Sequence, residues 1–230
     1  MKYIQFIVIL IIIITCENLA IYGQSETLVE PPKQSLTSVT LKAGPIRSDI
    51  YSFEKDELDD VSIESRSGFS AGMSLCLGIS QVFAIQPEIM YSIKGAKALK
   101  LDGGTIREYY DLELHYVEIP ILFKFVAPIG GTVRGNIYFG PFGAVNIENK
   151  SRLHRVIAET NTVVADEVPT EFNDRFIPFD AGGMLGGGMS FRLLGTELMI
   201  DARCSLSAVS LTKGDEVHNR TFSLMIGITF

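Results

Sequence analysis

Glu88 and Glu118 are the best candidates for a pair of acid–base catalysts, because both stand on the polar side of neighbouring alternating segments. The sequence does not fix their relative register and implies no cleft around them, so structural pairing with cations is the stronger interpretation. The three histidines, His115, His154 and His218, lie in different segments without the spacing of metal ligands. We therefore expect no catalytic, metal or cofactor site and no enzymatic activity.

The composition narrows the class of protein further. The chain has 230 residues, of which 20 are Lys or Arg and 27 are Asp or Glu, giving a net charge of -7 at pH 7. This acidic balance argues against nucleic-acid partners, whose phosphates attract a basic surface. Three cysteines are too few for a disulfide-bonded miniature scaffold, and a hydrophobic content of 47% excludes a highly charged disordered chain.

Residues 1–23 are predicted to be a signal peptide. Lys2 precedes an apolar run of about eleven residues, which is shorter than the ~20 residues of a membrane-spanning helix. Cleavage after Gly23 is expected because a small residue stands before the cut. Cys16 offers an alternative, the acceptor cysteine of a lipoprotein, although Thr15 before it is not the small residue that such sites prefer.

Residues 24–38 are polar and contain a Pro-Pro pair, so they are expected to form a periplasmic N-terminal linker. No later stretch changes composition abruptly, and residues 39–230 are predicted to be a single domain. Within it, eight segments alternate between apolar and polar residues, which is typical of strands with two unlike faces. These segments are 39–44, 68–77, 83–94, 115–125, 136–149, 179–191, 197–204 and 222–230.

The connections between these segments alternate in length. The short ones are residues 78–81, 127–135 and 192–195, and the long ones are residues 47–66, 96–112, 150–176 and 207–220. Outer-membrane barrels have short periplasmic turns, long outer loops and both chain ends on the periplasmic side. The sequence therefore predicts an all-β fold, an eight-stranded antiparallel transmembrane β-barrel with short periplasmic turns and four long outer loops.

One face of the segments is apolar, whereas the other holds small residues and nearly all the charges. The apolar face points outward in a lipid-embedded barrel and inward in a soluble lipocalin-like barrel. The near absence of charge on the apolar face, and small residues suited to a narrow interior on the other, favour the lipid-embedded barrel. The charged residues then expected in the lumen are Lys42, Glu88, Lys94, Glu118, Lys124, Asp180, Glu197, Asp201 and Arg203.

Four of these lumen residues are positive and five are negative. An eight-stranded barrel is just filled by its interior side chains, and an unpaired buried charge is costly. We expect a salt-bridged plug that closes the barrel rather than a conduction path or a proton relay. Replacing Lys124 by alanine is then expected to destabilise the barrel without opening a channel.

Cysteine and glycine positions fit the same barrel. Cys76 and Cys204 fall on opposite faces of the wall, so two free thiols are expected. The glycine-rich stretch 182–188 does not fit a dinucleotide-binding turn and is expected to permit curvature and close packing against large lumen residues such as Tyr116. Aromatic residues near strand ends are expected to form girdles at the membrane interfaces, namely Tyr91, Tyr109, Tyr110, Tyr138, Phe176 and Phe191.

Three segments resemble the outer-membrane β-barrel family common in Bacteroidetes, whose members include PorT-like proteins. They are YVEIPILFK at 116–124, YFGPFG at 138–143 and DAGG at 180–183. The C-terminal pattern resembles the signal recognised by the barrel-insertion machinery, carried here by Phe222, Leu224, Ile226, Ile228 and Phe230. The resemblance covers about residues 38–230 and implies an eight-stranded barrel in the bacterial outer membrane, in contact with its lipid.

The expected function is that of a small, non-conducting outer-membrane barrel with a structural or loop-mediated interaction role. One alternative, implied by the PorT-like members of the family, is a component of a secretion or assembly system with envelope proteins as partners. The other is a soluble, lipocalin-like carrier of an apolar ligand.

Overall fold

The computed structural model describes residues 37–52, 61–102, 106–130, 133–157, 163–169, 177–193, 196–212 and 217–230. The predicted signal peptide and residues 24–36 of the predicted linker lie outside these ranges. The described residues form the strands β1 (Thr37–Ser52), β2 (Val61–Gly78), β3 (Phe83–Asp102), β4 (Ile106–Gly130), β5 (Val133–Ile157), β6 (Val163–Pro169), β7 (Phe179–Leu193), β8 (Thr196–Ser207) and β9 (Val217–Thr229). Within the same ranges, no helix is long and apolar enough to cross a membrane.

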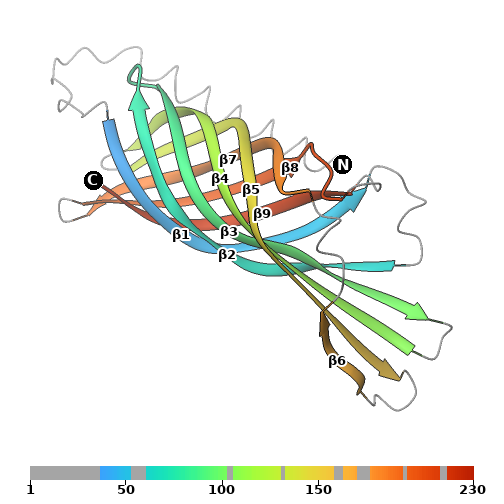
Figure 1. The fold of residues 1–230 in the computed structure, drawn as a ribbon. Helices are drawn as coiled ribbons and strands as arrows, with labels where there is room; N and C mark the ends of the chain where they lie inside the picture. The colour runs from blue at the N-terminus through green and yellow to red at the C-terminus, as the bar shows by residue number, and fades with distance from the viewer. Residues whose placement is uncertain are drawn as a thin grey trace, which may run out of the picture. The chain divides into compact units, whose positions relative to one another are not determined.

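Eight of the strands close into an antiparallel barrel (Figure 1). The order around the ring is β1, β2, β3, β4, β5, β7, β8 and β9, and β9 pairs with β1 to complete it. At this closing seam Leu41 stands opposite Ile228, and Arg47 stands opposite Phe222. Because a closed sheet has no edges, the backbone groups within the ring find their partners in neighbouring strands. The predicted eight-stranded barrel is therefore confirmed.

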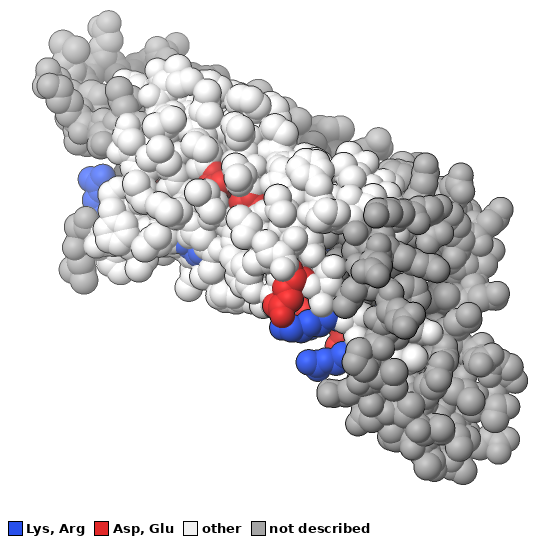
Figure 2. Space-filling model, in the orientation of Figure 1, with Lys and Arg blue, Asp and Glu red and all other residues white. Residues whose placement is uncertain are grey.

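The alternation of residue type along each strand sets the two faces of the wall. Outward apolar side chains are exposed, as at Ile119 with 54% and Ile226 with 68%, whereas inward Lys42 is only 3% exposed. On the face shown in Figure 2, most of the described surface is accordingly white, and the visible charged side chains gather mainly in one cluster near its lower edge. A lipocalin-like carrier requires apolar residues inside and charged residues outside, so that alternative is wrong.

Four strands continue past the closed ring as an open sheet, to which β6 adds a fifth strand, and we call this sheet the outer sheet. It consists of residues 61–65 of β2, 96–102 of β3, 106–115 of β4, 148–157 of β5, and the whole of β6. In Figure 1, β3, β4 and β5 run beyond the other strands, with β6 beside the end of β5. The connections that follow β2, β4 and β7 lie at the opposite end of the barrel, together with Thr37 and Phe230.

The strands run further than predicted and shorten the predicted long connections. β1 runs to Ser52, β3 to Asp102 and β5 to Ile157, so much of the predicted connections 47–66, 96–112 and 150–176 is strand. These strands continue because each backbone still finds hydrogen-bond partners in its neighbour. Along residues 96–102 and 106–112 the sequence no longer alternates regularly between apolar and polar types, as it does in the barrel segments.

Some glycines lie where a neighbouring backbone leaves no room for a side chain. A Cβ atom on Gly44 or on Gly182 would lie 2.0 Å from a carbonyl oxygen of the adjacent strand, that of Leu224 or Leu206 respectively. Such close approaches accompany the strong bending that a narrow barrel imposes on its strands. The prediction that glycine in the stretch 182–188 permits curvature agrees with this geometry.

Candidate functional site

The middle of the lumen holds four charged side chains in direct contact. The Glu88 carboxylate, on β3, lies 2.5 Å from Lys42 Nζ of β1 and 2.8 Å from the Arg203 guanidinium of β8. Asp201, also on β8, lies 2.6 Å from Arg203 and 3.6 Å from Lys42. None of the four residues is more than 3% exposed. Two cations therefore face two anions in a space that excludes water.

Tyr138 of β5 completes this group, and we call Lys42, Glu88, Tyr138, Asp201 and Arg203 the central cluster. The Tyr138 hydroxyl donates to Asp201, and its ring centroid lies 5.4 Å from Arg203 Cζ. The cluster joins β1, β3, β5 and β8, which stand on different sides of the ring, so its contacts cross the lumen.

The prediction that Tyr138 belongs to an interfacial girdle is wrong, because the residue is 1% exposed and points inward. That prediction considered only the nearness of Tyr138 to a strand end. The sequence itself contradicts the girdle position, since the apolar residues Ile137 and Phe139 on either side place Tyr138 on the polar face of the segment.

A second ion pair lies nearer the outer sheet. Lys94 Nζ of β3 is 2.5 Å from the Glu118 carboxylate of β4. The same ammonium lies 5.2 Å from the ring centroid of Phe142 and 5.5 Å from that of Tyr116. The two aromatic faces stabilise the cation on the sides that the carboxylate does not cover. Glu88 and Glu118 are thus each held by a cation, as structural pairing predicts.

Asp180 differs from the other lumen carboxylates because its contacts are with neutral groups. Its Oδ2 atom accepts hydrogen bonds from Ser207 at 2.9 Å and from Asn219 at 3.1 Å. Its Oδ1 atom has no hydrogen-bond partner among the described residues, and Asp180 is 2% exposed. The described residues provide no cation within 4.0 Å of it, so this buried charge lacks direct compensation.

Replacing Asp180 by asparagine is expected to raise the free energy of unfolding by about 1 kcal/mol, because the uncompensated charge disappears while an acceptor oxygen remains. Asp201→Asn, the matched control, is expected to lower it by about 2–4 kcal/mol because Arg203 and Lys42 lose a partner. Urea titration of the purified barrel in detergent micelles compares the two. Equal destabilisation by both variants would contradict this account and would indicate an unseen cation beside Asp180.

The end of the lumen nearest Thr37 and Phe230 is held by polar contacts. Lys124 Nζ donates to the Gln86 side chain at 3.0 Å, and Gln86 donates to Glu88 at 2.7 Å. Glu197 pairs with Arg134. Of the nine charged residues predicted for the lumen, seven are therefore deeply buried, whereas Lys124 and Glu197 are partly exposed. The functional importance of this set stays a prediction.

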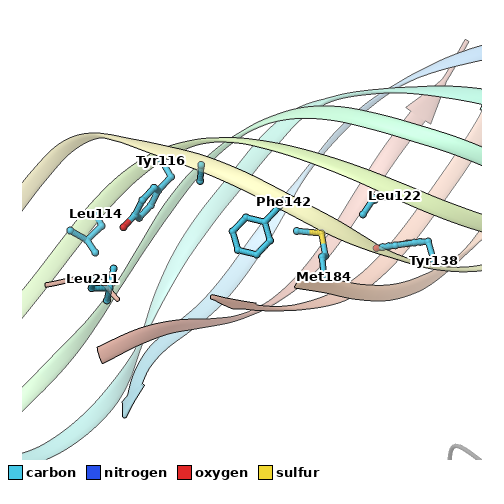
Figure 3. Packing of buried hydrophobic residues seen from close by; sticks show 8 residues of the cluster. Leu114, Tyr116, Leu122, Tyr138, Phe142, Met184 and Leu211 are labelled. Atoms are coloured by element: carbon cyan, nitrogen blue, oxygen red, sulfur yellow. The ribbon is translucent and has the colours of Figure 1, made fainter. Parts of the chain in front are cut away.

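Apolar side chains fill the lumen between the central cluster and the outer sheet. Figure 3 shows Met184 and Phe142 next to Tyr138, followed by Tyr116, Leu114 and then Leu211 from the connection between β8 and β9. Next to this packing, a cavity lined in part by Lys94, Glu118 and Thr221 measures about 10 Å³. That volume holds about one water molecule.

A polar cluster lies on the outward face, just beyond the apolar belt. The Tyr91 hydroxyl is 2.5 Å from His115 Nδ1, and Glu113 is 2.8 Å from His115 Nε2. Burial alone raises the pKa of the Glu113 carboxyl, but the His115 hydrogen bond and the Arg66 and Lys150 charges outweigh it and bring the pKa below its usual value. This cluster suits the polar boundary of a membrane.

The three histidines lie in different parts of the protein and have different contacts. His218 is buried, and its Nδ1 atom lies 3.1 Å from the Val209 carbonyl oxygen. His154 stands in the outer sheet opposite Tyr109, and His115 belongs to the polar cluster described above. In the part of the chain that the structure describes, no three His, Cys, Asp or Glu side chains are placed to hold a metal ion.

The remaining predicted residues line the wall of the barrel. Cys76 and Cys204 are both free thiols, as expected. The proposed C-terminal insertion signal points outward along β9 and Phe230, with all five residues exposed: Phe222, Leu224, Ile226, Ile228 and Phe230. Its recognition by insertion machinery stays a prediction.

No curated protein matches the chain. Among solved structures it is similar to OprG from Pseudomonas aeruginosa, with 10% identity over 85% of this chain and 96% of that chain and a TM-score of 0.45. It is similar to Neisserial surface protein A (15% identity, 85% and 98%, TM-score 0.43) and to Ail of Yersinia pestis (14% identity, 85% and 100%, TM-score 0.42). The family model for the outer membrane protein beta-barrel domain matches residues 24–211. With most of its length inside that match, the chain belongs to the outer membrane protein beta-barrel domain family.

Proposed function

We propose that this protein is a non-conducting outer-membrane barrel whose work is done by the outer sheet, which it holds at the cell surface for contact with a partner. The observation that carries the proposal is the contrast between the two halves of the molecule. The lumen is filled and cross-linked by buried ion pairs, whereas β3, β4 and β5 extend past the ring and carry charged side chains such as Lys97 and Asp111 at least partly exposed.

The filled lumen supports the non-conducting part of the proposal. Glu88 is bound to cations from two strands that do not neighbour its own, so an ion path would have to separate these contacts. Separating a buried ion pair leaves an uncompensated charge, at a cost of about 3–5 kcal/mol. The apolar layer of Phe142, Met184 and Leu211 adds a second barrier to ions.

The orientation supports the surface part of the proposal. Both ends of the barrel domain and the short connections lie at one end, which corresponds to the periplasmic end in outer-membrane barrels. The outer sheet lies at the other end and would face the cell exterior. Export by residues 1–23 and recognition of the C-terminal signal by the insertion machinery complete the proposal, which assigns the protein no enzymatic activity.

The test separates the outer sheet from the barrel by shortening one hairpin. In this variant an Asn-Gly turn replaces residues 97–111 and joins Ala96 to Leu112, which stand directly opposite each other in β3 and β4. Wild-type protein and the variant are both expected to give no single-channel steps in planar bilayers and to run differently on gels before and after heating. Stable conductance steps from the wild-type protein would refute the non-conducting barrel.

Complementation of cells that lack the protein then distinguishes a purely structural role from a role of the outer sheet. In cells that lack the protein, the shortened variant is expected to reach the outer membrane but not to restore the wild-type phenotype. Full restoration by the shortened variant would show that the barrel alone suffices, which is the purely structural role. A secretion defect restored only by the full chain would favour the PorT-like alternative, in which the outer sheet contacts a secretion or assembly component.

A further inference from the structure

The outer sheet carries a pocket on the face that continues the outward surface of the barrel. Two rows of side chains, in register across neighbouring strands, supply most of its lining. Leu99, Tyr109 and His154 stand opposite one another on β3, β4 and β5. Glu64, Lys97 and Asp111 form the next row, on β2, β3 and β4. Together these residues surround a cavity of about 200 Å³.

The chemistry of the lining restricts what the pocket can hold. Tyr109 is 41% exposed and offers an aromatic face, with Leu99 beside it. Glu64 and Asp111 provide carboxylate oxygens that accept hydrogen bonds, and Lys97 provides an ammonium group that can donate them. One aromatic face ringed by donors and acceptors suits a small ring with C–H groups on one side and hydroxyl groups around its edge.

Other ligand classes fit this lining less well. Glu64 and Lys97 balance in charge, and Arg66 balances Asp111, so these residues leave no excess positive charge to attract phosphate, sulfate or other anions. A purely aliphatic chain would leave the polar groups of the lining without partners, which is costly. Asp111 is already bound by Arg66 at 2.9 Å, which fixes its carboxylate in place for hydrogen bonding. The remaining class is an uncharged, hydroxyl-rich ring.

We propose that this pocket binds one uncharged hexose ring, with the sugar packed on Tyr109 and its hydroxyl groups bound by Glu64 and Asp111. The inference rests on the proposed function and names the chemistry that the outer sheet recognises. Because the pocket continues the outward face just beyond the polar cluster of His115 and Glu113, the nearest source of such a ring is the headgroup of a surface glycolipid. A free glycan carries the same chemistry.

The experiment measures saturation-transfer NMR signals from three methyl hexosides (gluco, galacto and manno) with the full-length barrel. The protein is held in a detergent without a sugar headgroup, so that the detergent does not compete. Saturable binding of at least one hexoside is expected, with Tyr109→Ala weakening it at least about tenfold. Tyr109→Phe keeps the aromatic face and is expected to bind as the wild type does. Glu148→Gln, on the same outward face but outside the pocket, is the matched control and is also expected to bind normally.

Three outcomes would overturn the inference: no saturable binding of any hexoside, equal loss in Tyr109→Ala and Glu148→Gln, or unchanged binding in Tyr109→Ala. Heat-dependent gel mobility of each variant confirms that the barrel is folded when binding is measured. A repeat in nanodiscs with and without a hexose-bearing glycolipid distinguishes the sources, since a lipid-bound headgroup would displace the free hexoside. Failure here, with the shortened hairpin still inactive in cells, would refute the hexose and leave the surface role intact.

Discussion

Replacement of Glu88 by alanine is expected to lower the free energy of unfolding by about 3–5 kcal/mol, the largest effect of any single lumen charge. The carboxylate compensates both Lys42 and Arg203 and also accepts a hydrogen bond from Gln86. After its removal, Asp201 alone faces two buried cations. The measurement is the urea midpoint of unfolding of the purified barrel in micelles. The folded fraction at each urea concentration is the fraction that keeps its unheated gel mobility.

Glu148→Ala provides the control for this substitution. Glu148 lies on the outward face with its side chain 52% exposed, and its Lys150 partner at 3.2 Å is also partly exposed. An exposed ion pair contributes about 0–1 kcal/mol, so this variant is expected to unfold close to the wild-type midpoint. If Glu88→Ala had the same urea midpoint as Glu148→Ala, the central cluster would not be what holds the barrel closed.

The central role of Glu88 could not be predicted from the sequence. Alternation places Glu88 and Lys124 on the same face and does not distinguish which of the two contributes more to stability. In the structure Lys124 is partly exposed and donates to the neutral Gln86, whereas Glu88 is the hub of the ion pairs. Parity along a strand gives the face, but the height of a residue in the lumen depends on the tilt and stagger of strands far apart in sequence. Glu88 and Arg203 are 115 residues apart.

The barrel itself was predictable because its signal is repeated in every strand. A membrane-embedded wall requires apolar residues on one side and excludes charge from it, so each strand reports its own orientation. The outer sheet was not predictable in the same way. Residues 96–102 and 106–112 pair with each other through backbone hydrogen bonds, and neither face there has to be apolar. Strand β6 depends on the extended edge of β5 and escaped prediction for the same reason.

The pocket of the outer sheet shows the same limit at the level of single residues. From the sequence, Tyr109 is predicted to be an interfacial aromatic residue and His154 an isolated histidine. The register of β4 and β5 places them directly opposite each other. Since 45 positions separate them in sequence and no alternation links them, only the pairing of the strands brings them together.

Gly186→Ala is expected to destabilise the barrel by about 1–3 kcal/mol, although it adds a single methyl group. A Cβ atom on Gly186 would lie 2.3 Å from the Tyr138 hydroxyl oxygen and 2.5 Å from its Cζ atom. The ring cannot swing aside without losing its hydrogen bond to Asp201 and its contact with Arg203. Urea titration against Gly183→Ala provides the comparison, because a Cβ on Gly183 of the same strand meets no atom within 4 Å.

A double-mutant cycle identifies the cause of this loss. In a Tyr138→Leu background the shorter side chain leaves room at residue 186, so Gly186→Ala is expected to cost less than about 0.5 kcal/mol. Additive losses in the double variant would mean that Gly186 serves strand curvature by itself. Strong coupling between the two substitutions would mean that Gly186 leaves the space that the Tyr138 ring occupies. The hydrogen bond from Tyr138 to Asp201 would then depend on that glycine. The small residues of β7 and the charged residues of β8 would then act together, because close strand packing positions the ion pairs that close the lumen.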